Sequence, residues 1–247
     1  MRGKIYLVGV GPGSQDDITP RAAKVLKNVQ VIIGHKVCLD LLWKYVIGKE
    51  IVAAEMTPVE RAAMAVEKAR QGRDVAVVSS GDIGIYAFAS TFFCYLRDNE
   101  LKAEVEVIPG VTVASAAAAL LGSPLGCDFA AISLADQAAE WSRIKKRLIS
   151  AIESDFVIIL YNPIGKVGSK RVAEAIRILL KHRQAATPVG IVTSATTGQE
   201  KVTITTLGEV SVGQIETDTM VIIGNSETYV YNGWIVTPRG YVEGLGY

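Results

Sequence analysis

A glycine-rich loop near the start of the chain is the first stretch that could do chemistry. A short apolar, β-favouring run, residues 4–8, is followed at once by Gly9-Val10-Gly11-Pro12-Gly13-Ser14. This pattern is typical of a buried strand that stops at a tight turn, where the backbone can approach a ligand closely. Taken alone, the loop supports a small-molecule site only about as well as it supports a plain strand-to-helix turn.

The loop does not match the dinucleotide-binding fingerprint. Ser14 stands where that fingerprint has its last glycine, and Pro12 has no N–H to offer a phosphate. The next apolar run ends in Gly34-His35, without the acidic residue that would hold a ribose. A nicotinamide cofactor is therefore not indicated.

A second polar glycine turn, Ser79-Ser80-Gly81-Asp82, follows the apolar run of residues 74–78. Ligands of open α/β sheets bind outside the carboxyl ends of the strands. We therefore expect this turn to lie beside the first loop, which makes a binding site more credible than either loop does separately.

Several motifs in this order resemble the tetrapyrrole methylase family, whose members use S-adenosylmethionine. They are the two glycine turns, Ile18-Thr19-Pro20-Arg21-Ala22-Ala23, and Ile108-Pro109-Gly110-Val111-Thr112. The stretches 120–134, Tyr161-Asn162-Pro163, Gly224-Asn225-Ser226 and Thr237-Pro238-Arg239-Gly240-Tyr241 are similar to one branch of that family. That branch methylates carbon 17 of precorrin-3B and contracts the macrocycle on the route to cobalamin.

The resemblance implies a set of S-adenosylmethionine contacts. They are Pro12, Ser80, Gly81, Asp82, Ile85, Tyr86, Thr112, Val113, Tyr161, Asn162, Gly190 and Met220. Exposed backbone at glycine turns can pair with the polar groups of such a cofactor, and apolar side chains can cover its adenine and sulfur. The Tyr161-Asn162 pair by itself favours an ordinary strand-ending turn.

The implied substrate is a large macrocycle fringed with carboxylates, which arginine binds well. Arg21 and Arg61 each follow a Thr-Pro helix start, and we expect both to face the strand-end edge. Ring contraction needs acid–base help, for which Asp82, Asp136 and His35 are our catalytic candidates by residue type. The run 143–147 is interpreted as an exposed helix face.

Composition argues against several other classes. Lys and Arg number 26 against 25 Asp and Glu, so no overall field favours nucleic acid or an anionic membrane. The three cysteines are far apart, which disfavours a metal site and fits a reducing compartment. No signal sequence is evident and no run approaches the roughly eighteen apolar residues of a membrane span, so we expect a cytoplasmic protein.

The elements that must position these residues alternate strand and helix, which predicts two α/β domains. Residues 1–112 should form a mainly parallel sheet, with helices starting at Thr19-Pro20 and Thr57-Pro58 and a further helix over 39–46. Residues 113–247 should form a mixed sheet, because Lys201–Thr206 alternates polar and apolar side chains. The family resemblance implies an active site in the cleft between the domains, and a homodimer.

Two alternatives stay open. One keeps the enzyme class but changes the acceptor, to another precorrin carbon such as carbon 11 or to a non-tetrapyrrole substrate as in diphthine synthase. The other is a binding protein that holds a corrinoid intermediate without turnover. The intact Gly81-Asp82 turn disfavours a pure carrier, which has no need of a methyl donor.

Overall fold

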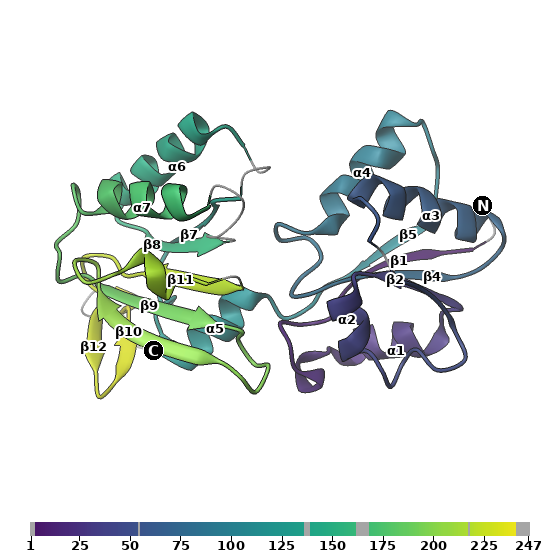
Figure 1. Ribbon diagram of the computed structural model, residues 1–247, viewed down its shortest axis with the longest axis horizontal. Helices are drawn as coiled ribbons and strands as arrows, with labels where there is room; N and C mark the ends of the chain where they lie inside the picture. Colours follow the sequence, from purple (N-terminus) through teal and green to yellow (C-terminus); the bar gives the residue numbers. More distant parts are fainter. Residues whose placement is uncertain (1–2, 54, 136–138, 162–167, 217, 241–247) are drawn as a thin grey trace. The chain divides into compact units, whose positions relative to one another are not determined.

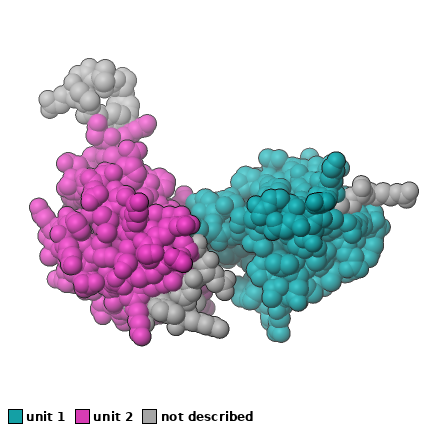
Figure 2. Space-filling model, turned by 90° about the horizontal axis from the view of Figure 1, so that it is seen from above, with its two compact units in different colours: residues 1–113 teal, residues 114–247 magenta. Residues whose placement is uncertain are grey.

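The computed structural model describes residues 3–53, 55–135, 139–161, 168–216 and 218–240. The chain divides into two compact units, residues 1–113 and 114–247 (Figure 2). Whether the parts expected at 1–112 and 113–247 are independent domains stays a prediction. Each unit is built on its own five-stranded sheet with helices on both faces (Figure 1), so the predicted fold class is confirmed.

Unit 1 contains a fully parallel sheet. Its strands are β1 (Ile5–Gly9), β2 (Val31–Gly34), β3 (Glu50–Ala53), β4 (Val75–Ser79) and β5 (Val105–Ile108), in the order β3-β2-β4-β1-β5. Helices α1 (Pro20–Asn28) and α2 (Lys36–Leu41) cover one face, and α3 (Pro58–Arg70) and α4 (Phe88–Asp98) cover the other (Figure 1). A 3-10 turn, η1 (Gln15–Asp17), precedes α1.

The core of unit 1 has two halves because successive strand side chains point to opposite faces of the sheet. Ile5, Leu7 and Val77 pack toward the α3 and α4 face. Val8 and Val78 pack toward the α1 and α2 face. All five are fully buried, so β1 and β4 are held in the middle of the sheet by apolar contacts on both sides.

The capped helix starts are confirmed. The Thr19 hydroxyl accepts the Ala22 N–H at 3.2 Å, and Thr57 forms a capping box with Glu60. The helix expected over 39–46 is wrong in its bounds, since α2 runs from Lys36 to Leu41. The His35 carbonyl accepts the N–H groups of Cys38 and Leu39, which starts the helix earlier, and turns replace it after Leu41.

Unit 2 contains the predicted mixed sheet. Its strands are β7 (Phe129–Ser133), β8 (Val157–Tyr161), β9 (Pro188–Thr193), β10 (Lys201–Thr206) and β11 (Thr219–Ile223), in the order β10-β9-β11-β8-β7. Only the β7–β8 pair is parallel. Helices α6 (Trp141–Glu153) and α7 (Gly168–Leu179) cover one face, and α5 (Val113–Leu121) lies against the other (Figure 1). The 3-10 turn η2 (Val212–Gln214) leads into β11.

A small third sheet was not predicted. It joins β12 (Tyr229–Tyr231), β13 (Trp234–Val236) and the two-residue β6 (Gly122–Ser123). Strands of two or three residues carry too short a pattern to be recognised by periodicity. A buried hydroxyl pair, Thr228 with Thr237 at 2.8 Å, connects the two ends of the β12–β13 hairpin.

Candidate functional site

Three loops leave the carboxyl edge of the unit 1 sheet side by side, because β1 lies between β4 and β5. The loop after β1 and the turn after β4 are joined by two backbone hydrogen bonds. Gly11 N–H donates to the Gly81 carbonyl at 3.2 Å, and Gly81 N–H donates to the Gly11 carbonyl at 2.7 Å. The expectation that the two glycine turns lie together is therefore confirmed.

The third loop, after β5, meets the first two at glycines. A Cβ atom on Gly110 would lie 2.3 Å from the Gly81 carbonyl oxygen and 2.7 Å from the Gly9 carbonyl carbon. A Cβ on Gly9 would lie 2.7 Å from both the Gly110 nitrogen and the Gly81 oxygen. Neither approach is possible with a side chain, so this junction requires glycine at both positions. It presents main chain instead of side chains.

Asp82 stabilises this junction through two hydrogen bonds to main-chain N–H groups. Its carboxylate accepts the Gly84 N–H at 2.8 Å and the Gly110 N–H at 3.0 Å. The first bond shapes the turn after β4, and the second ties that turn to the loop after β5. Both carboxylate oxygens are thus engaged with main chain, and this explains why the turn requires an aspartate. A catalytic role for Asp82 stays a prediction.

The other unit 1 residues expected to touch the cofactor surround the junction. Ser80, Ile85 and Tyr86 are exposed, and Pro12, Thr112 and Val113 are half-buried. Tyr86 adopts a positive φ of 50°, which is uncommon for a bulky side chain and holds it in an unusual direction. With 43% of Ile85 and 51% of Tyr86 exposed, apolar surface is available beside the junction.

The candidates His35 and Arg21 lie in different settings. His35 is exposed directly after β2, at the N-cap position of α2, and its side chain makes no capping bond. Arg21 was expected to face the strand-end edge, but its guanidinium is ion-paired with Glu106 at 2.7 Å. Glu106 lies opposite Tyr6, two residues before the end of β5. The pair holds Arg21 below that edge, and a substrate role for Arg21 stays a prediction.

Arg61 lies in the first turn of α3 and is half-buried. Its guanidinium carbon is 5.2 Å from the centre of the Phe88 ring, a cation–π contact. Burial lowers the pKa of Arg61, and burial also raises the pKa of the neighbouring Cys38 thiol. The Cys38 sulfur is in turn hydrogen-bonded to the backbone of Ser80. Arg61 is therefore close to the turn that follows β4.

The site residues expected in unit 2 lie on its sheet. Tyr161 is buried at the end of β8, opposite Ser133. Met220 is buried in β11, and Gly190 is buried in β9, where a Cβ would lie 2.3 Å from Leu121 of α5. Close packing against α5 therefore favours glycine at position 190 without any ligand contact. Asp136 and Asn162 lie outside the described residues.

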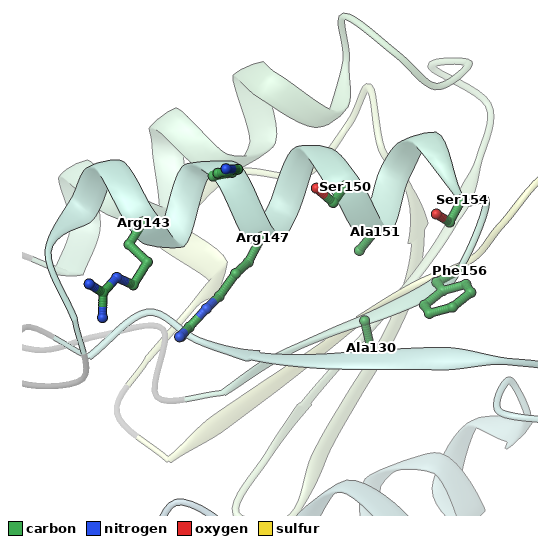
Figure 3. Close-up of a pocket in the computed structure, with 8 residues that line it drawn as sticks. Ala130, Arg143, Arg147, Ser150, Ala151, Ser154 and Phe156 are labelled. Atoms are coloured by element: carbon green, nitrogen blue, oxygen red, sulfur yellow. The ribbon is translucent and has the colours of Figure 1, made fainter.

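A separate pocket of about 500 Å³ lies along α6 in unit 2 (Figure 3). Its lining is Ala130, Arg143, Lys146, Arg147, Ser150, Ala151, Ser154 and Phe156. Arg143 and Arg147 extend from the helix on the same side (Figure 3), and both are exposed, whereas Lys145 pairs with Glu174 at 3.3 Å. The exposed helix face expected for this run is confirmed at these arginines. None of the predicted site residues lines this pocket.

Sequence reasoning missed two features of the unit 1 site. Gly9 and Gly110 were not among the expected contacts, although each stands directly at or after the end of a strand. Cys38 was considered for metal binding and redox compartment, and not as a neighbour of the site. Among the described residues, no group of three or more His, Cys, Asp or Glu side chains is placed to hold a metal ion. In the same ranges, no helix is both long and apolar enough to cross a membrane.

Comparison with known proteins agrees with this architecture. The sequence model of the Tetrapyrrole (Corrin/Porphyrin) Methylases matches residues 4–211. The chain therefore belongs to the tetrapyrrole methylase family, and the class of reaction is methyl transfer.

More particular similarities lie within that family. The chain is 39% identical to the "Probable cobalt-factor III C(17)-methyltransferase" of Salmonella typhimurium over 96% of its own length and 99% of that protein. It is 40% identical to the "Cobalt-factor III methyltransferase" of Priestia megaterium, but there it spans only 46% of the relative's length. Its fold matches the crystal structure of the methyltransferase CobJ with a TM-score of 0.89 and 30% identity, covering 96% of this chain and 100% of that one.

Proposed function

We propose that this chain transfers a methyl group from S-adenosylmethionine to carbon 17 of a precorrin-3B or cobalt-factor III macrocycle. Ring contraction to a precorrin-4-type product would accompany the transfer, in cobalamin biosynthesis. The names and nearly complete coverage of the Salmonella relative and the CobJ match support this acceptor. Cobalt, where present, belongs to the substrate.

The glycine junction of Gly9, Gly81 and Gly110 carries the proposal. The main chain of the three loops packs together where any side chain would collide, and Gly9 and Gly81 are buried. This packing holds the three loops close enough for their exposed neighbours, such as Ser80 and Gly84, to offer backbone groups to one ligand. The loop that carries Pro12, the Ser80-Gly81-Asp82 turn and the Thr112-Val113 pair are the segments that would hold S-adenosylmethionine. This cofactor supplies an activated methyl group on a sulfonium.

The residues of the chain have a positioning task in this reaction. When bound, S-adenosylmethionine would supply the methyl group for the new carbon–carbon bond and would leave as S-adenosylhomocysteine once its carbon–sulfur bond is broken. Holding donor and acceptor in line is worth on the order of 7–11 kcal/mol in well-aligned systems. Asp82 contributes by fixing two of the three loops, and exposed Ile85 and Tyr86 offer apolar surface that could exclude water.

The test is a product analysis. Precorrin-3B and cobalt-factor III are each incubated with the protein and S-adenosylmethionine, the mass of the product is measured, and NMR locates the added methyl. We expect one methyl at carbon 17 and a contracted ring. A methyl on carbon 11 would support the alternative acceptor, and binding of the macrocycle without methylation would support the carrier.

The homodimer is a further proposal, supported by the family resemblance alone. Light scattering after size-exclusion chromatography measures the mass directly. A mass near twice the 26.4 kDa of the chain is expected.

A further inference from the structure

Arg61 carries a charge for which the described residues supply no ion pair. Its Nε is buried and has no hydrogen-bond partner, and the residue as a whole is half-buried. No carboxylate among the described residues contributes to its electrostatic environment, in which only Cys38 acts on it. A buried guanidinium nitrogen without a partner is unfavourable, because its lost water contact is not replaced.

Other arginines of the chain are placed differently. Arg21 pairs with Glu106, and Arg73 pairs with Glu50. Arg183 also has an unpartnered Nε, but its two terminal nitrogens donate to the carbonyls of Gly224 and Phe156. Arg183 thus stabilises unit 2. Among the described residues, the interactions of Arg61 are with the Phe88 ring and the Cys38 thiol.

The thiol does not neutralise Arg61. Burial raises the pKa of Cys38, so the group stays protonated at neutral pH. Cys38 nevertheless indicates where the Arg61 side chain lies. Its sulfur is hydrogen-bonded to the Ser80 backbone and also interacts electrostatically with the Arg61 guanidinium. The Arg61 side chain therefore lies where α2, α3 and the turn after β4 come together, next to the Ser80-Gly81-Asp82 turn.

We propose that Arg61 is a binding residue that supplies the counter-charge for a ligand carboxylate at the carboxyl edge of the unit 1 sheet. Arginine is suited to this task because it stays charged and pairs with carboxylates in two-point geometry. The carboxylate has two possible sources, the fringe of the macrocycle and the amino-acid end of S-adenosylmethionine. The inference rests on the proposed function for the identity of these ligands.

The first measurement is the melting temperature of the ligand-free protein. Arg61→Met should leave it unchanged or raise it, because a half-buried charge with an unpartnered Nε is replaced by an apolar side chain of similar length. Arg183→Met should lower it, since the carbonyls of Gly224 and Phe156 lose their donor. Arg70→Met, at the exposed end of the same helix, is the matched control and should match the parent protein.

The second measurement separates the two carboxylates by direct binding. Calorimetry compares S-adenosylhomocysteine with 5′-methylthioadenosine, which lacks the amino-acid end, and absorption titration follows cobalt-factor III. If Arg61 pairs with the cofactor, Arg61→Met weakens the binding of S-adenosylhomocysteine at least about tenfold and leaves the affinity for methylthioadenosine unchanged. If it pairs with the macrocycle, only cobalt-factor III binding weakens by that factor.

In either case Arg61→Lys should recover part of the loss. The proposal is overturned if Arg61→Met binds all three ligands like the parent, or if it weakens both nucleosides equally, which would indicate a distorted site. These titrations need no turnover. They therefore test Arg61 even if the parent protein methylates neither macrocycle and the proposed function fails.

Discussion

The Asp82 carboxylate accepts the Gly110 N–H at 3.0 Å, across 28 residues of sequence. This hydrogen bond ties the turn after β4 to the loop after β5, and β1 lies between these two strands. The same carboxylate accepts the Gly84 N–H at 2.8 Å within its own turn. One side chain thus sets the geometry of two of the three loops at the candidate cofactor site.

Removing that carboxylate should affect both stability and binding. Asp82→Ala leaves two main-chain donors without their partner and should cost about 1.5–3 kcal/mol of unfolding free energy. The loosened loops should also bind S-adenosylhomocysteine more weakly. Urea denaturation and calorimetry measure the two effects, with exposed Asp98→Ala as the control. Unchanged affinity in a folded Asp82→Ala protein would remove Asp82 from the site.

Adding one methyl group at the junction should be more disruptive than its size suggests. The new Cβ in Gly110→Ala would lie 2.3 Å from the Gly81 oxygen, and backbone cannot move aside cheaply. We expect a loss of at least about 1–3 kcal/mol and of S-adenosylhomocysteine binding. Gly213→Ala is the matched control, because its Cβ would meet nothing nearer than 3.7 Å. A Gly110→Ala protein with parental stability and affinity would show that the glycine junction does not require glycine at this position.

Gly190 can be assigned to packing or to ligand contact by a double substitution. Gly190→Ala should destabilise unit 2 by about 1–3 kcal/mol, because its Cβ would lie 2.3 Å from a Leu121 methyl. Leu121→Ala removes that methyl, so the two changes together should be less harmful than the sum of the two alone. Thermal or urea unfolding of the four proteins measures the coupling. Strict additivity would show that Leu121 is not why glycine is needed.

The acid limit of stability should depend on Glu106. Hydrogen bonds from Lys4 and then Arg21 hold the pKa of this carboxyl below its usual value. A carboxyl with a lowered folded-state pKa stabilises the protein above its unfolded pKa, and this contribution is lost as the pH falls through the folded pKa. Glu106→Gln should therefore melt below the parent at pH 7, and the gap should close as the pH falls from about 5 to about 3. A difference in melting temperature that stays constant with pH would argue against the ion pairs as its cause. The control is Glu67→Gln, at an exposed position.

The sequence was sufficient for the parts of the fold that depend on near neighbours. The Thr19 and Thr57 caps, the apolar strands and the turns after them follow from interactions within a few residues. The bounds of α2 were wrong because its start depends on carbonyl bonding at His35 and not on the apolar pattern. The third sheet was missed because its short strands are stabilised by partners far away in sequence.

The sequence by itself determined the family, the two sheets and the loops on which a cofactor site could be built. Only the tertiary structure decided which groups meet. The order of strands places β1 between β4 and β5, and this order brings Gly9, Gly81 and Gly110 together. Arg21 and Arg61 follow the same Thr-Pro motif, yet Arg21 is paired with Glu106, whereas no carboxylate in the described part of the chain pairs with Arg61. Periodicity and capping act locally, whereas contact and burial depend on neighbours that the sheet brings in from distant segments.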